Sequence, residues 1–372
     1  MLQKLILERK FLRNINFGIL FIAILIVGFG CLNIYAAVGG SAVKLQIAWL
    51  LISLLFLYAI LLIDSSTIMR ITPIFYWANI LLLIYVDLFG NVVNGARGWI
   101  GIGSRALQPS EFAKVAMIMM LAKKLDDMEG KINNIKNFFI LAFYAIIPMG
   151  LIVIQPDMGM TMVSFFIVLG IFFIAGLDLR IIFGGITALV ALVAVLWNSS
   201  LMEAYWKKRL TIFLHPESDQ LGAGLQLIQS MTGIGSGGIF GNGVKTGTKA
   251  MSGFVAQFVP ENNTDFIFAM VGEKWGFIGG TVLLFLYFLL LAQIIRASKK
   301  SKDLFGSLVC IGVFSSLLFS IIENIGMTIG VMPITGITLP FMSSGGSSML
   351  SNFIALGLIM NIGMRSKKIN FI

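Results

Sequence analysis

Residues 17–35 read FGILFIAILIVGFGCLNIY and include no charged side chain. A helix of about 20 apolar residues is long enough to cross the hydrocarbon core of a bilayer. Of the 372 residues, 58% are hydrophobic and 12% are charged, whereas a soluble domain carries about 25% charged residues. This chain has too few charges to cover a water-facing surface, which indicates that lipid surrounds most of it.

Further apolar runs of this kind follow along the whole chain. Hydropathy predicts an all-α polytopic membrane protein with about ten transmembrane helices in a single domain, residues 1–372. We expect residues 99–108, just before the short fourth span, to pack at membrane depth. The expected spans are 17–35, 47–63, 73–89, 109–122, 138–154, 158–175, 181–197, 266–295, 305–328 and 347–364.

The positions of lysine and arginine predict the orientation in the membrane. Most of them fall in segments that share a side with the N-terminus, which the positive-inside rule assigns to the cytoplasm. Both termini are then cytoplasmic, and the net charge of +10 reflects topology rather than nucleic-acid binding. The large loop at about 198–265, between the seventh and eighth helices, is then extracytoplasmic. Its many apolar residues favour an ordered loop over the alternative, a flexible tether.

Two ionisable residues lie in the expected helix that begins at Pro109. Glu111 and Lys114 are three residues apart, so they face the same side of a helix and can pair. A charge at membrane depth costs about 2.5–3.5 kcal/mol, which makes it a functional candidate. Either this pair is a buried structural salt bridge, or Lys114 faces an outward cavity and binds an anionic group of a substrate.

Two aspartates lie at expected outer helix starts. Asp157, in the turn QPDMG, can cap the following helix or contribute to a site. Asp265 lies where the large loop re-enters the membrane, and apolar residues follow it. Desolvation at such a boundary makes a carboxylate more basic, as a general base requires. An N-cap of the next helix is an equally good interpretation of Asp265.

Basic residues on the expected outer side run against the positive-inside rule. Arg97 and Arg105 flank Trp99, and Lys245 and Lys249 precede Asp265. Cations beside carboxylates suit the pyrophosphate headgroup of a lipid carrier. Attraction to ordinary anionic lipid headgroups is the competing interpretation.

Several short motifs occur in an order that resembles the SEDS family (shape, elongation, division and sporulation). The resemblance runs from about residue 94 to the C-terminus, and the forms at 155–157 and 247–249 are more similar to its RodA branch than to the division paralogue FtsW. The chain departs from the family at Gly98, where arginine is usual, and at Asn262 and Asn263, where histidine is frequent. The motifs are GARGW (95–99), QPSEFAK (108–114), QPDMG (155–159), QS (229–230) with GSGG (235–238), FVPENNTDFIFA (258–269) and LPFMSSGGSS (339–348).

This resemblance implies a ten-helix fold and a peptidoglycan glycosyltransferase of the bacterial plasma membrane. Such an enzyme polymerises lipid II into β-1,4 glycan strands at the outer membrane face during cell-wall elongation. The implied partners are a class B penicillin-binding protein transpeptidase and membrane proteins of the elongation complex. Asp265 matches the essential outer-loop aspartate of the family, and Trp99, Glu111 and Lys114 match functionally important positions.

Lipid II carries its sugar on pyrophosphate through an α bond, so a β-linked product requires an inverting displacement. Our hypothesis makes Asp265 the general base for the acceptor hydroxyl, while cations, with a divalent ion such as Mg²⁺ or Mn²⁺ as a candidate cofactor, neutralise the leaving pyrophosphate. Lys114, Arg97 and Arg105 are the candidates for that second role. The predicted substrate-binding residues are Arg97, Trp99, Arg105, Glu111, Lys114, Asp157, Lys245 and Lys249.

Functions from other classes compete with this hypothesis. A lipid II flippase would need an anion site on the inner side, whereas the membrane-depth charges here gather toward the outer side. A scaffold that only binds a partner synthase would not need carboxylates and basic groups around one cavity. Within the family, a division or sporulation paralogue similar to FtsW is the other alternative.

Overall fold

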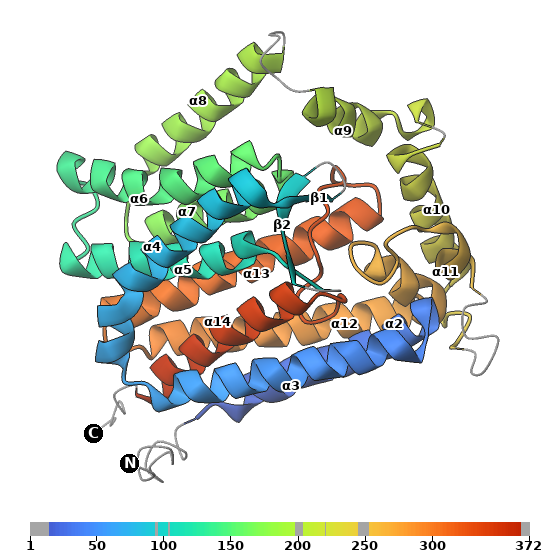
Figure 1. Ribbon diagram of the computed structural model, residues 1–372, viewed down its shortest axis with the longest axis horizontal. Helices are drawn as coiled ribbons and strands as arrows, with labels where there is room; N and C mark the ends of the chain where they lie inside the picture. Colours follow the sequence, from blue (N-terminus) through green and yellow to red (C-terminus); the bar gives the residue numbers. More distant parts are fainter. Residues whose placement is uncertain are drawn as a thin grey trace.

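The computed structural model describes residues 15–93, 96–102, 105–197, 204–219, 221–244 and 253–365. Most of this part is a bundle of long helices that run side by side (Figure 1). The long helices are α2 (Phe17–Val38), α3 (Gly40–Leu62), α4 (Ser65–Phe89), α5 (Pro109–Asp127), α6 (Ile135–Ile154), α7 (Met158–Ile174), α8 (Leu179–Trp197), α12 (Ile267–Lys299), α13 (Leu304–Thr328) and α14 (Gly346–Met364).

The bundle has the composition of a membrane protein. Within the described residues, seven helices are long and apolar enough to cross a bilayer, namely α2, α3, α4, α6, α12, α13 and α14, and α7 and α8 contain shorter apolar stretches. Helix α5 is charged but mostly buried, so its neighbours shield it from lipid. Every stretch expected from hydropathy overlaps one of these helices, and the structure confirms a helical, multi-pass membrane fold.

A small sheet occupies the segment before α5. Strands β1 (Asn91–Val93), β2 (Ala96–Ile102) and β3 (Arg105–Leu107) pair antiparallel in the order β1-β2-β3. The expectation of an all-α chain is therefore wrong here. Hydropathy indicates how apolar a segment is, but in a short apolar run it does not distinguish a paired strand from a packed helix. Pairing within the sheet satisfies backbone groups that would otherwise need water.

The segment 198–265 contains further helices where the structure describes it: α9 (Ala204–Leu214), the 3-10 turn η2 (Pro216–Ser218), α10 (Ala223–Ser236) and α11 (Phe254–Phe258). Helix α10 packs on α12, where the backbones approach so closely that a Cβ on Gly237 would overlap the Gly272 carbonyl. Helices α10 and α11 are folded against the bundle, as the ordered-loop interpretation predicted.

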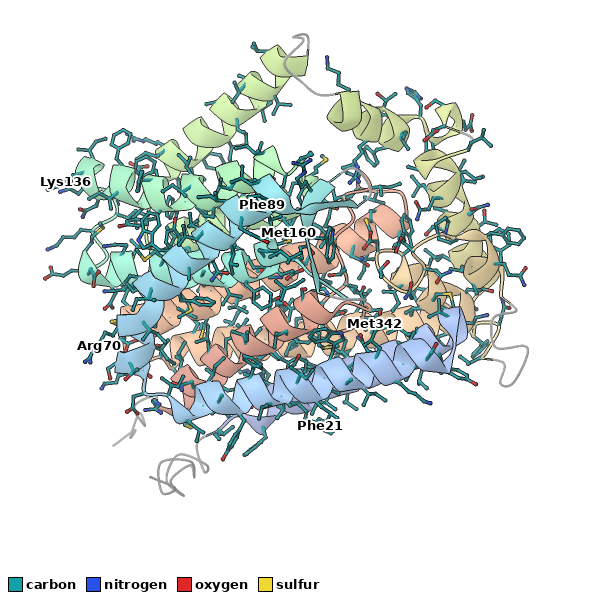
Figure 2. The ribbon with its side chains drawn as sticks, in the orientation of Figure 1. Phe21, Arg70, Phe89, Lys136, Met160 and Met342 are labelled. Atoms are coloured by element: carbon teal, nitrogen blue, oxygen red, sulfur yellow. The ribbon has the colours of Figure 1, made fainter. Side chains whose placement is uncertain are left out.

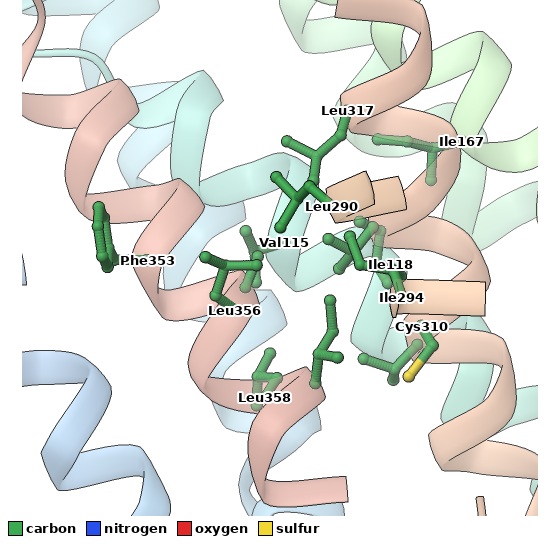
Figure 3. Packing of buried hydrophobic residues seen from close by; sticks show 14 of the residues in the cluster. Val115, Ile118, Ile167, Leu290, Ile294, Cys310, Leu317, Phe353, Leu356 and Leu358 are labelled. Atoms are coloured by element: carbon green, nitrogen blue, oxygen red, sulfur yellow. The ribbon is translucent and has the colours of Figure 1, made fainter. Parts of the chain in front are cut away.

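The core lies between the central helices. Figure 3 shows Ile118 from α5, Ile167 from α7, Leu290 and Ile294 from α12 and Cys310 from α13 converging in one apolar cluster. Helix α8 stands apart from this core and contacts α7 only weakly (Figure 1). The bundle itself, rather than α8, therefore sets the relative positions of the loops at its ends.

Both ends of the bundle can be recognised by their residues. Figure 2 places Arg70 and Lys136 at the end of the bundle where α2 begins and α14 ends. At that end Arg365, just after α14, pairs with Asp64. The β strands, α9 and the first residues of α14 lie at the opposite end (Figure 1).

Two glycines of α2 test the packing of this bundle against the loop before α14. A Cβ on Gly30 would overlap the carbonyl oxygen of Met342, whereas a Cβ on Gly28 would meet nothing within 4 Å. We expect Gly30→Ala to lower the thermal unfolding midpoint in detergent, with a cost of about 1–3 kcal/mol from overpacking.

The matched control is Gly28→Ala, which should be neutral or slightly stabilising because alanine favours a helix over glycine. Equal midpoints for both variants would contradict the close packing of α2 on Met342.

Candidate functional site

A cavity of about 270 Å³ opens at the end of the bundle opposite the chain termini. It is bounded by residues from segments that are far apart in the sequence. Its described lining residues are Trp99, Gln108, Pro156, Asp157, Met158, Arg209, Glu261, Thr264, Asp265, Thr335, Gly336, Thr338, Ser344, Gly345, Gly346, Ser347 and Ser348. Three carboxylates and one guanidinium thus face the same enclosed space.

Four helices begin at this cavity: α5, α7, α12 and α14. The first turn of a helix leaves N–H groups without helical partners and carries a partial positive charge. Within the described residues, no side chain caps α5, α12 or α14. Converging helix N-termini of this kind favour an anionic ligand.

Asp265 lines the cavity just before α12 and is half-buried. Its side chain does not cap α12, whose N-cap position is Phe266 without a side-chain bond. The capping interpretation of Asp265 is therefore wrong, and its carboxylate faces the cavity instead.

The backbone around Asp265 is held by buried side chains. The Asn324 amide donates to the carbonyl oxygens of Asp265 and Ile337, at 2.7 Å each. The Ser343 hydroxyl donates to the Thr264 carbonyl at 2.6 Å, and the Ser344 N–H donates to the Asn263 carbonyl. These hydrogen bonds join the loop before α14 to the turn before α12, and the two segments together form one wall of the cavity.

The surroundings of Asp265 change its acidity. Burial raises the pKa of the Asp265 carboxyl to about 7, and the negative charge of Glu261 adds to the increase. The Arg209 guanidinium acts in the opposite direction, and Asp157 raises the pKa slightly further. A carboxylate with a pKa near neutrality is a much stronger base than an ordinary aspartate.

Asp157 caps α7, as one interpretation of its sequence predicted, and it also lines the cavity. Its Oδ1 accepts from the Met160 N–H at 2.9 Å and caps α7, while Oδ2 accepts from the Gln108 amide at 3.1 Å. Burial raises the pKa of Asp157 above its ordinary value. Asp157 therefore joins the starts of α5 and α7 at the edge of the cavity.

Glu111 and Lys114 form a buried ion pair with 2.6 Å between Lys114 Nζ and Glu111 Oε2. The Ser351 hydroxyl of α14 donates to the same carboxylate oxygen at 2.8 Å. Neither residue is among those that line the cavity. The pair joins α5 to α14 one turn below the cavity, which corresponds to the structural interpretation of these charges.

The basic residues that the sequence predicted to bind substrate do not appear in the described cavity lining. Arg97 is exposed and donates to the Asp87 carbonyl at 3.3 Å, outside the cavity lining. The Arg105 side chain lies outside the described residues, as do Lys245 and Lys249. Trp99 lines the cavity, and its role in binding substrate stays a prediction.

Arg209 is the basic residue that lines the cavity within the described part of the chain. Its Nη1 donates to the Ile334 carbonyl at 2.8 Å, which directs α9 toward the site. The sequence pointed to other basic residues and did not single out Arg209. Its signal was weak, because it is one of three adjacent basic residues at 207–209 and only the path of α9 distinguishes them.

The described residues also test whether a metal ion fits. Among them, no group of three His, Cys, Asp or Glu side chains is arranged to hold a metal ion. We derive no reaction step through a divalent cation.

Comparison with known proteins places this fold and cavity in a family. The family model "cell cycle protein", FtsW/RodA/SpoVE, matches residues 11–368. The chain belongs to this family. It is 34% identical to the peptidoglycan glycosyltransferase RodA of Treponema pallidum, over 86% of this chain and 89% of that protein. It is 39% identical to stage V sporulation protein E of Bacillus subtilis, over 77% of each chain.

The fold also matches solved structures. A chain from a study of the "structural coordination of polymerization and crosslinking by a peptidoglycan synthase complex" superposes with a TM-score of 0.81. That match has 30% sequence identity and covers 94% of this chain and 97% of the other. Membership of the family, anticipated from the motifs, is thereby confirmed.

Asn324 provides a test of how the site is held. In Asn324→Leu the carbonyls of Asp265 and Ile337 lose their donor, and a buried polar group without a partner costs about 1–3 kcal/mol. We expect a clear fall in the thermal unfolding midpoint in detergent.

The matched control is Asn33→Leu in α2. Asn33 is equally buried, but it donates only to Phe29 within its own helix. This variant should lose much less stability. An Asn324→Leu midpoint no lower than that of Asn33→Leu would contradict the role of Asn324.

Proposed function

We propose that this protein is a peptidoglycan glycosyltransferase that polymerises lipid II into β-1,4 glycan strands. The observation that carries the proposal is one cavity with two complementary parts. It contains a carboxylate of raised pKa, Asp265, and it is surrounded by helix N-termini and the Arg209 guanidinium. The first part suits a hydroxyl that must lose a proton, and the second suits a pyrophosphate. The enzyme name of the Treponema relative supports the same reaction.

In the proposed reaction Asp265 accepts the proton of the acceptor sugar's 4-hydroxyl. The oxygen then forms a bond to the anomeric carbon of the donor as the bond from that carbon to the pyrophosphate oxygen breaks. The electron pair leaves with the lipid pyrophosphate, and the configuration inverts from α to β. Asp265 afterwards returns its proton to solvent through the cavity.

Arg209 lines the cavity, whereas Lys114 and Arg97 do not, so Arg209 neutralises the pyrophosphate in this proposal. The side chain of the third candidate, Arg105, lies outside the described residues. A guanidinium can donate two parallel hydrogen bonds to phosphate oxygens. The uncapped starts of α5, α12 and α14 add N–H donors and partial positive charge. Stabilising charge that develops on a leaving group is often the largest catalytic contribution. Trp99 at the rim offers a flat surface for a sugar ring.

We further propose ten membrane crossings with both termini in the cytoplasm. The cavity then faces the outer side of the plasma membrane, where lipid II would meet it. The segment around α9, α10 and α11 becomes the extracytoplasmic loop. Basic residues such as Arg70 and Lys136 at the opposite end support this orientation (Figure 2).

A transpeptidase partner of class B completes the proposal, because new glycan strands must be cross-linked. The solved synthase complex that this chain resembles is described as coordinating polymerisation and crosslinking. A role in elongation follows from the RodA-like motifs. The sporulation relative shows that related chains serve other stages of the cell cycle.

The proposed base is tested by Asp265→Asn in purified protein with labelled lipid II, with and without a transpeptidase partner. Loss of a general base lowers the rate by about a hundredfold or more. Glycan polymer is measured on a gel, and size-exclusion elution checks that the protein is folded. Asp127→Asn, which alters an exposed carboxylate paired with Lys123, is the matched control and should polymerise normally.

Near-normal polymer from folded Asp265→Asn would remove this residue from the mechanism. Transfer of lipid II headgroups across vesicles that contain only this protein, without polymer, would favour the flippase.

The raised pKa of Asp265 predicts the pH dependence. The base acts when ionised, so kcat/KM should fall as the pH drops below about 7. The negative charge of Glu261 raises this pKa. In Glu261→Gln the pKa should therefore fall, and the acidic limb of the profile should move to lower pH.

The matched control is Glu129→Gln, an exposed change beyond the far end of α5 that should leave the profile unchanged. A limb that moves to higher pH in Glu261→Gln, or does not move, would contradict the electrostatic account.

A further inference from the structure

Glu323 is a buried carboxyl group that the proposed mechanism does not use. It lies in α13, its residue exposure is 0%, and it faces no cation in the described ion pairs. Neither of its oxygens has a hydrogen bond of good geometry among the described residues. Buried polar groups are nearly always paired, so a residue of this kind calls for an explanation.

The polar group that faces Glu323 is the hydroxyl of Thr335. Thr335 is 5% exposed, and its Oγ1 also has no hydrogen bond of good geometry within the described structure. Two carboxyl oxygens and one hydroxyl therefore lie together at a buried position, within reach of one another and with no other hydrogen-bond partner among the described residues.

Thr335 belongs to a short segment, residues 334–337, that lies beside Asp265. Gly336 has a φ of +78°, and a Cβ built on it would come within 3.4 Å of Asp265 Oδ2. On the other side, a Cβ on Gly159 of α7 would lie 3.1 Å from the Thr335 carbonyl oxygen. The 334–337 segment is thus confined between α7 and the proposed base.

Side chains from two helices hold the ends of the 334–337 segment. Arg209 of α9 donates to the Ile334 carbonyl, and Asn324 of α13 donates to the Ile337 carbonyl. Asn324 also donates to the Asp265 carbonyl. Glu323 precedes Asn324, so consecutive residues of α13 reach Thr335 and Ile337, on either side of Gly336.

We propose that Glu323 is a positioning residue, which as a neutral acid donates a hydrogen bond to Thr335 and fixes the 334–337 segment against Asp265. This inference rests on the proposed function, because its consequence is the placement of the general base. Glu323 itself does not line the cavity and touches no substrate.

Burial explains why the neutral acid is the form that fits. A lone carboxylate charge without a cation is expensive to bury, whereas a carboxylic acid has one O–H donor to offer. The Thr335 hydroxyl can accept that hydrogen bond. Glutamine is nearly the same size and also donates, so it can replace Glu323, whereas leucine fills the space without a donor.

Four single variants test the pair: Glu323→Gln, Glu323→Leu, Thr335→Ser and Thr335→Val. Displacing a catalytic group by about 1 Å can cost a hundredfold in rate. We expect Glu323→Leu and Thr335→Val to lower kcat for glycan polymerisation by about tenfold or more, while KM changes by less than about twofold. Glu323→Gln and Thr335→Ser keep the hydrogen bond and should remain within about threefold of the parent kcat.

The double variant Glu323→Leu with Thr335→Val tests whether both residues act through one contact. Its kcat should be no lower than that of the less active single variant, because the effects of substitutions at two interacting residues do not add. Ser316→Ala, at another buried polar position of α13, is the matched control and should retain the parent kcat. All rates are normalised to folded protein from size exclusion.

Parent-like kcat in Glu323→Leu, or equal damage in Glu323→Gln and Glu323→Leu, would overturn the inference. If Glu323→Leu does not fold, parent-like kcat in Thr335→Val overturns it alone. Asp265→Asn in the same series separates the two levels. An active Asp265→Asn variant would overturn the proposed function. An inactive Asp265→Asn variant together with normal activity in Glu323→Leu would overturn only the role of Glu323.

Discussion

The amide of Asn324 holds the site together from within the bundle. It donates to the backbone of Asp265 before α12 and to that of Ile337 before α14. Both carbonyls lie in irregular backbone, where no helix or sheet supplies hydrogen-bond donors for them. At membrane depth such groups must find partners inside the protein. One buried side chain therefore sets the distance between two loops, and the cavity lies between them.

The electrostatics of the cavity depend on this enclosure. Burial and the neighbouring Glu261 raise the pKa of Asp265, while Arg209 lowers it, and the result is a value of about 7. The same removal from water strengthens the effect of the helix N-termini on an anion. A strong base and an anion site are thus produced by the same geometry, although each would be weaker on an open surface.

The charges at membrane depth divide between structure and chemistry. Glu111 and Lys114 neutralise one another and, through Ser351, join α5 to α14. Glu273 accepts from the N–H groups of Phe254 and Val255 and so fixes the start of α11. These carboxylates have partners within the protein. Asp265 instead faces the cavity, which is why we propose Asp265 as the residue that takes part in the chemistry.

The membrane class, the positions of the long helices and the family could all be predicted from the residues alone. Apolar length and loop charge are local properties, and hydropathy measures them directly. The motif around Asp265 also singled out a carboxylate that lines the cavity. The strands before α5 were missed because apolar content alone does not distinguish a paired strand from a packed helix.

Only the tertiary structure decided which charged groups meet. From the sequence, Lys114 is a reasonable candidate for an anion ligand, but in the structure it pairs with Glu111. Arg209 lines the cavity, yet nothing in the sequence distinguishes it from its two basic neighbours. Glu323 lies in α13 and Thr335 in the loop after it, so the sequence does not show that their side chains face each other. Spacing along a chain determines faces of single elements, but a cavity at which four helices begin depends on how those elements pack, and packing is a property of the whole bundle.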